Sequence, residues 1–157
     1  MQGLTVRLPG TSRGAPLDAR HALGKSGGLN VSPPLVIEDV PPEARSLAFM
    51  LVDRDAADFV HWLVTDLPAA PLELAEGASG EAMPAASNEL YTTAESVGYY
   101  GPNPPPRSGK HRYELVAYAL DVDSLDVSDH ADAATFDAKA AEHAVAIGSN
   151  YWMFENR

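Results

Sequence analysis

Two groups of polar residues in this sequence have types and spacings that could carry chemistry. In the first, Asp53 and Asp55 follow one apolar stretch and His61 lies inside the next. The period of two in a strand puts His61 on the same face as Phe59 and Leu63, so its imidazole points among apolar groups. A buried imidazole needs a hydrogen-bond partner. We expect Asp53 to supply it, fixing the tautomer of His61 and raising its pKa.

The second group is His111 and Tyr113, which lie two residues apart and therefore on one face of a strand. They follow residues 98–109, which are rich in glycine and proline and cannot form a helix, since proline lacks the amide hydrogen and fixes φ. We expect a shaped loop that ends at this imidazole and phenol. Their N–H and O–H groups, together with loop amides such as that of Asn103, could bind an anion.

Other chemistries are less well supported by the residues. One aspartate and two histidines could form a metal site, but their spacing is not typical of zinc ligands, so no metal is expected. Ser108 and Ser149 have no evident general base and orienting group around them, and the nucleophile elbow Gly-x-Ser-x-Gly is absent. The glycine-rich stretch lacks the phosphate-binding Walker pattern. We therefore expect neither a serine nucleophile nor a nucleotide site.

The elements that position these residues are mostly strands. Residues 46–53 and 59–67 are apolar on both faces, as is typical of buried strands in a sandwich, and 113–120 form a third such run. The helical spacing of apolar residues predicts a helix over 132–147, capped by Asp132 or Thr135 and stopped by Gly148. Residues 151–154 are expected to form a final strand. The pattern predicts an all-β sandwich with one late helix.

Composition limits the classes of function. The 157 residues suit a single domain, 1–157, and the absence of cysteine excludes disulfides and a cysteine nucleophile. The net charge of −11 argues against nucleic-acid binding and against anionic membrane surfaces. No stretch is long and apolar enough for a membrane span, and no leader peptide is evident, so a cytoplasmic protein is expected. The acidic surface also suits a high-salt organism.

Taken together, these motifs resemble the phosphatidylethanolamine-binding protein family, and most closely its prokaryotic Raf-kinase-inhibitor-like branch. The resemblance covers nearly the whole chain and rests on the combination of segments, each of which is weak alone. The segments are Asp-Arg-Asp-Ala at 53–56, His-Trp at 61–62, Gly-Tyr-Tyr-Gly-Pro-Asn-Pro-Pro at 98–105 and His-Arg-Tyr at 111–113.

This resemblance implies a Greek-key β-sandwich with a small anion pocket at one end. The family motif places seven residues in that pocket: Asp53, His61, Asn103, Pro104, Pro105, His111 and Tyr113. Arg54, Asp55 and Gly101 would form its rim. Arg54 stands where the family has a proline and Asn103 where it has a small residue, so either side chain could narrow or block the pocket.

The function implied is binding of a phosphate-like anion or a phospholipid head group, such as phosphate or a phosphoethanolamine, without catalysis and without a cofactor. At least one of His61 and His111 would be protonated, and a homodimer is expected from the prokaryotic branch. An alternative is a serine protease or kinase inhibitor that contacts its partner through the Gly98–Gly109 loop. A third reading, a phosphoester hydrolase with His61 or His111 as general base, is the least favoured.

Overall fold

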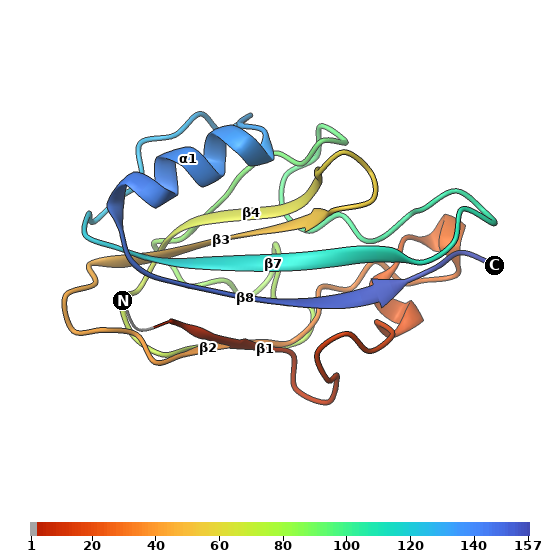
Figure 1. Cartoon of the computed structure of the whole chain (residues 1–157), viewed down its shortest axis with the longest axis horizontal. Coiled ribbons are helices and arrows are strands. Elements are labelled where there is room, and N and C mark those ends of the chain that lie inside the picture. The colour runs from red at the N-terminus through yellow and green to blue at the C-terminus, as the bar shows by residue number, and fades with distance from the viewer. Residues whose placement is uncertain (1–2) are drawn as a thin grey trace.

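The structure, a computed structural model, describes residues 3–157 as two antiparallel sheets with one α-helix (Figure 1). The larger sheet has the order β6-β4-β3-β7-β8 and the smaller one the order β1-β2-β5. The strands are β1 (Thr5–Arg7), β2 (Leu35–Glu38), β3 (Ser46–Asp53), β4 (Phe59–Leu67), β5 (Leu72–Leu74), β6 (Asn88–Glu89), β7 (His111–Leu120) and β8 (Ala144–Phe154). The prediction of a mostly β chain with one late helix is confirmed, while the Greek-key description stays a prediction.

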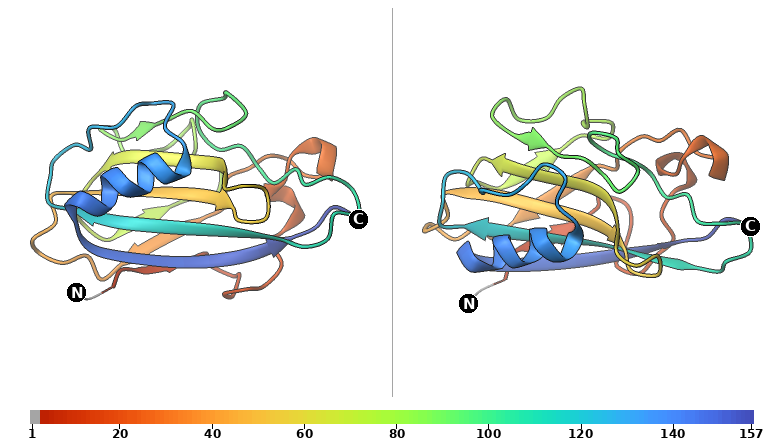
Figure 2. Two further views of the ribbon diagram at one scale, coloured as in Figure 1. Left: turned by 45° about the horizontal axis from the view of Figure 1, so that its top comes forward. Right: turned by 90° about the horizontal axis from the view of Figure 1, so that it is seen from above.

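Two apolar layers cover the two faces of the larger sheet. Phe49 and Trp62 belong to the layer that joins it to the smaller sheet, and their rings meet edge to face at 4.9 Å. On the other face, Met50 of β3 packs in a second layer with Phe136 of the helix α1 (Ala133–His143). Figure 2 shows α1 lying along that face. Every residue of β3 is buried, which is why its sequence is apolar on both faces.

The helix is shorter than the sequence predicts. Asp132 caps it by accepting a hydrogen bond from the amide of Thr135 at 2.8 Å, as one of the two expected caps. However, α1 ends at His143, and residues 144–154 all belong to β8, which pairs with β7 along its whole length. The small apolar residues at 144–147 fit the period of a helix as well as that of a strand, and their pairing with β7 makes them a strand. The helix to 147 and the short strand 151–154 were therefore wrong predictions.

Gly148 has a different role from the predicted helix stop. A Cβ at this position would lie 2.0 Å from the carbonyl oxygen of Leu4, so glycine lets the N-terminal segment cross β8 closely.

Three segments that are distant in sequence meet at one end of the larger sheet (Figure 1). They are the loop from 101 to 110, the short 3-10 helices Ala19–His21 and Gly24–Ser26, and the C-terminal residues. Backbone hydrogen bonds join them: Leu23 N–H donates to Pro102 O and Arg107 N–H to Asn156 O, both at 3.0 Å. This end also holds the turn between β3 and β4, so the predicted site residues gather here. No helix among residues 3–157 is long and apolar enough to cross a membrane.

Candidate functional site

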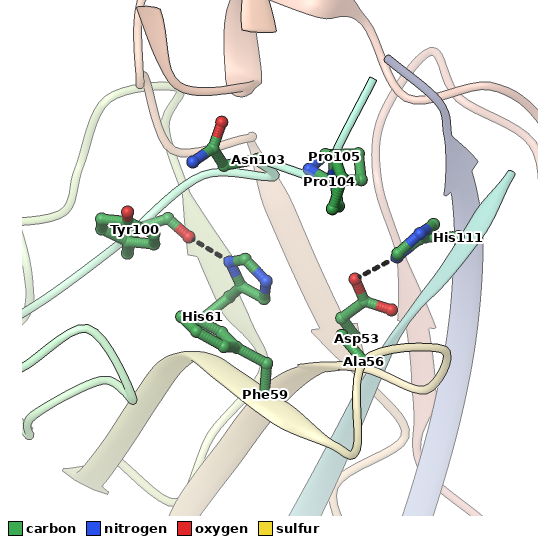
Figure 3. Close-up of a pocket in the computed structure, with 9 residues that line it drawn as sticks. All are labelled: Asp53, Ala56, Phe59, His61, Tyr100, Asn103, Pro104, Pro105 and His111. Atoms are coloured by element: carbon green, nitrogen blue, oxygen red, sulfur yellow. Dashed lines mark hydrogen bonds and ion pairs between the residues drawn. The ribbon is translucent and has the colours of Figure 1, made fainter. Parts of the chain in front are cut away.

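A cavity of about 220 Å³ opens where the proline-rich loop crosses the ends of β3, β4 and β7 (Figure 3). Six of the seven residues predicted to bind a ligand line it, and the seventh, Tyr113, lies behind the wall. Three further lining residues were not predicted. The lining residues are Asp53, Ala56, Phe59, His61, Tyr100, Asn103, Pro104, Pro105 and His111.

The most buried polar contact at the cavity joins Asp53 to His111. Asp53 is 2% exposed and His111 6% exposed, and His111 Nδ1 lies 2.7 Å from Asp53 Oδ2. The other carboxylate oxygen accepts the amide of Asp55 at 2.9 Å, and the Asp55 carboxylate in turn accepts the amide of Arg112 at 2.7 Å. The Asp-x-Asp turn therefore holds the end of β3 against the beginning of β7. The Asp53 carboxylate also fixes the tautomer of His111 that carries its proton on Nδ1, because an ionised carboxylate can only accept a hydrogen bond.

The predicted pairing of Asp53 with His61 is wrong. Leu51 pairs with Trp62 but Val52 pairs with Val60, so His61 is the extra residue of a β-bulge in β4. The bulge breaks the period-two alternation. His61 keeps its ring beside Phe59, at 4.8 Å between centroids, whereas Leu63 faces the helix side of the sheet.

His61 is neutral at pH 7, contrary to the predicted rise in its pKa. Its Nδ1 lies 2.5 Å from the carbonyl oxygen of Tyr100, so Nδ1–H is the donor and the Nε2 lone pair is left free. Burial lowers the pKa of His61 to about 4, and neither the Tyr100 carbonyl nor the negative charge of Asp53 offsets it. The cavity thus contains one imidazole that accepts hydrogen bonds.

Tyr113 stands behind the two imidazoles and is 1% exposed. Its ring meets His61 edge to face at 5.3 Å and stacks with His111 at 6.4 Å. Burial raises the pKa of its hydroxyl, and the neighbouring Asp53 charge raises it further, so the group stays protonated. Among residues 3–157 this hydroxyl has no hydrogen-bond partner. It is a buried donor beside the Asp53 carboxylate, behind the cavity lining.

Of the two side chains that could narrow or block the cavity, Arg54 lies outside it and Asn103 forms part of its wall. Arg54 turns to Glu114 at 2.8 Å and Asp58 at 3.1 Å and is absent from the lining. Asn103 does line the cavity, but its side-chain oxygen accepts a hydrogen bond from Ser26 Oγ at 3.0 Å.

Gly101 is a packing position under the short 3-10 helices. A Cβ there would lie 2.2 Å from the carbonyl oxygen of His21, while its amide donates to Asn30 Oδ1 at 2.7 Å. It holds the adjoining Tyr100 carbonyl against His61.

Ser108 lies at this site, against the sequence prediction that it has no base and orienting group. Its Oγ is 3.0 Å from His111 Nε2, on the opposite side of the ring from Asp53. The Ser108 amide bonds the carbonyl of Pro105 at 3.2 Å, and this turn folds the serine back over a histidine three residues later. Among residues 3–157, no group of three acidic or histidine side chains is arranged to hold a metal ion.

The fold and site define a class of small β proteins with two sheets and a histidine-lined cavity at the end of the larger one. The family model described as phosphatidylethanolamine-binding protein matches residues 9–152. The chain belongs to this family, as its sequence motifs predicted.

Relatives and solved structures agree with this assignment. The UPF0098 protein YbhB of Escherichia coli is 34% identical over 148 residues, covering 90% of this chain and 93% of the relative. A UPF0098 protein of Chlamydia muridarum is 37% identical over 118 residues, covering 71% and 72%. The structure of a homologue of these binding proteins from Chlamydia trachomatis matches with a TM-score of 0.81 at 29% identity, over 99% of both chains. E. coli YbcL shares the fold, with a TM-score of 0.89 at 23% identity over 99% of this chain and 100% of that one.

Proposed function

We propose that this chain is a binding protein whose cavity holds a small phosphate-like anion, such as the head group of a phospholipid. The observation that carries the proposal is the buried Asp53–His111 pair at the cavity wall, with the hydroxyl of Tyr113 behind it, beside Asp53. A protonated His111 would supply the positive charge, because Asp53 holds its Nδ1–H and leaves Nε2–H for a ligand oxygen. The hydroxyl of Ser108, which lies on an exposed loop, would leave His111 Nε2, and the ligand oxygen would take its place.

The neutral His61 indicates which ligands suit the cavity best. Its Nε2 is an acceptor, and so is the Asp53 carboxylate, so two cavity walls favour a donor. A ligand with an anionic phosphate and an ammonium group could use both kinds of wall. O-Phosphoethanolamine has this chemistry, and the name of the family supports it. The volume of about 220 Å³ is below the range typical of drug-sized ligands, which suits a head group.

Calorimetry tests this proposal directly. His111→Ala should abolish binding of O-phosphoethanolamine and of phosphate while the circular dichroism spectrum stays that of the parent chain. The matched control is His143→Ala, an exposed histidine that pairs with Asp121 outside the cavity. Unchanged affinity in His111→Ala would refute the assignment.

One observation favours inhibition of a serine protease or kinase as a second candidate. Residues 105–110 are exposed and project beyond the sheet at the cavity end (Figure 1). A carboxypeptidase Y inhibitor, solved with its cognate proteinase, matches with a TM-score of 0.59 at 22% identity, over 98% of this chain and 83% of that one. Charge reversal at Arg107 and Lys110 should abolish inhibition of a susceptible serine carboxypeptidase, whereas reversal at Lys139 on α1 should not. Equal inhibition by both variants would exclude the loop as the contact.

A further inference from the structure

We propose that Ser108 is a nucleophile, activated by His111 and Asp53, that accepts the acyl group of small carboxylic esters. The inference shares Asp53 and His111 with the anion-binding proposal, but it adds Ser108 and a covalent step that anion binding does not need. It rests on two contacts made by the two nitrogens of one ring: Asp53 Oδ2 is 2.7 Å from His111 Nδ1, and His111 Nε2 is 3.0 Å from Ser108 Oγ. A nucleophile, a base within hydrogen-bond reach and a third group that orients the base are the arrangement that activates serine.

The hydrogen-bond partners of the three groups fit this role. Asp53 is buried, and its second oxygen is held by the Asp55 amide, so the carboxylate keeps the His111 proton on Nδ1. Neutral His111 then carries a lone pair on Nε2 that can accept the Ser108 hydroxyl proton. When His111 is protonated, Nε2–H donates to Ser108 Oγ and the hydroxyl turns to the Pro105 carbonyl, 2.7 Å away. In both states every group has a hydrogen-bond partner, and the serine adapts to the change by rotating its hydroxyl about the Cβ–Oγ bond.

Ser108 is also accessible, which separates it from a purely structural turn residue. The segment from Pro105 to Lys110 is exposed, and nothing lies within 4 Å of a Cβ built at Gly109, so the residue that follows Ser108 borders open space. Among residues 3–157, the amides of Gly109 and Lys110 donate no hydrogen bond to the protein. They directly follow the nucleophile, and the amide after a nucleophilic serine is a common oxyanion donor.

The neighbouring cavity supplies room for one part of the ester. Pro105 and His111 both line it and both contact Ser108, so an acyl carbonyl at Ser108 would place one substituent at the cavity mouth. Across the cavity, beside His61, the wall is largely apolar, with Phe59 and Tyr100 (Figure 3). A small apolar acyl group fits this surface.

Hydrolysis of the ester would need no reactant other than water. Ser108 Oγ would attack the ester carbonyl carbon while its proton moves to His111 Nε2, and the tetrahedral intermediate would expel the alcohol, which takes that proton. Water would then attack the acyl-serine, with His111 again as base, and release the carboxylic acid and free Ser108.

A fluorophosphonate probe tests the proposal on the intact chain at pH 8. Peptide mapping should find one phosphonyl group per chain, on Ser108, formed at least 100-fold faster than on any other serine. His111→Gln should slow labelling by about 100-fold or more, the usual contribution of a general base. The matched control Ser149→Ala should label like the parent chain.

The second readout is hydrolysis of p-nitrophenyl butyrate. Ser108→Ala should reduce the rate to that of free imidazole at equal concentration, and this exposed substitution keeps the test valid if His111→Gln fails to fold. The pH–rate profile should follow one ionisation, that of the base. Absence of the Ser108 adduct, labelling spread over several serines, or equal turnover in Ser108→Ala would each overturn the proposal.

Discussion

Stability should depend on pH through the buried neutral imidazole of His61. In the unfolded chain this histidine titrates near 6.5, whereas burial holds its folded pKa at about 4. Between these two values the unfolded chain binds more protons than the folded chain. The contribution of His61 to stability is therefore fully present above about pH 6.5 and is lost as pH falls toward 4.

The size of the effect follows from the pKa shift. A shift from 6.5 to about 4 corresponds to about 3 kcal/mol across the full window. Most of this, about 2–3 kcal/mol, should be lost between pH 7.5 and pH 4.5.

Urea unfolding of a variant pair isolates this contribution from the many carboxylates of the chain. His61→Asn keeps an N–H donor near the Tyr100 carbonyl and cannot titrate. Its free energy of unfolding, subtracted from that of the parent chain at each pH, should leave a difference that changes by about 2–3 kcal/mol between pH 7.5 and 4.5. His143→Asn, at an exposed histidine, should show no comparable change. Parallel parent and His61→Asn curves would refute the assignment of a buried neutral imidazole.

Three further substitutions separate packing from binding. Gly101→Ala should lower the free energy of unfolding by about 2–3 kcal/mol, because the new Cβ would lie 2.2 Å from a backbone oxygen. The control Gly24→Ala, with open space around it, should change the free energy of unfolding by less than about 1 kcal/mol. Equal effects of the two substitutions would contradict the close approach at Gly101. Tyr113→Phe should change the free energy of unfolding by about 1 kcal/mol or less, since the hydroxyl meets no partner at full hydrogen-bond geometry. It should weaken O-phosphoethanolamine binding, measured by calorimetry, because the hydroxyl lies beside the Asp53 carboxylate that holds His111; unaltered affinity would remove the hydroxyl from the site. Arg54→Ala should lower the free energy of unfolding by about 1 kcal/mol and leave the affinity for O-phosphoethanolamine within about twofold. A larger loss of affinity would show that Arg54 takes part in ligand binding.

The central strands could be predicted from sequence because their burial on both faces leaves a strong pattern. β3 and β4 have the predicted bounds, and β7 begins two residues earlier than expected, at His111. The end of α1 could not be predicted, since Ala144 to Ile147 fit a helix as well as a strand. Pairing with β7, a contact distant in sequence, determines the result.

The site was predicted as a set of residues but not as a set of contacts. Residue types and motif order indicated Asp53, His61 and His111. The partner of Asp53, however, depends on strand order, because β3 lies between β4 and β7. The bulge at His61 leaves no clear mark in the sequence, and it redirected the expected pairing.

Two contributors to the site were open to prediction and were missed. Phe59 shares the strand face of His61 by the period of two, and Tyr100 lies in the proline-rich loop itself. The contact of Ser108 with His111 was not predicted, although the two residues are only three apart in a turn-forming stretch. Identifying the orienting Asp53 beside them required the β3–β7 register.

An NMR titration of the five histidine rings with O-phosphoethanolamine tests the binding proposal most directly. We expect the signals of His61 and His111 to shift and saturate together, while His21, His130 and His143 stay in place and sodium chloride at equal ionic strength has no effect. Phosphate should shift His111 more than His61, because His61 offers only an acceptor. If neither ring shifts, or if all five drift alike, the cavity does not bind this class of ligand.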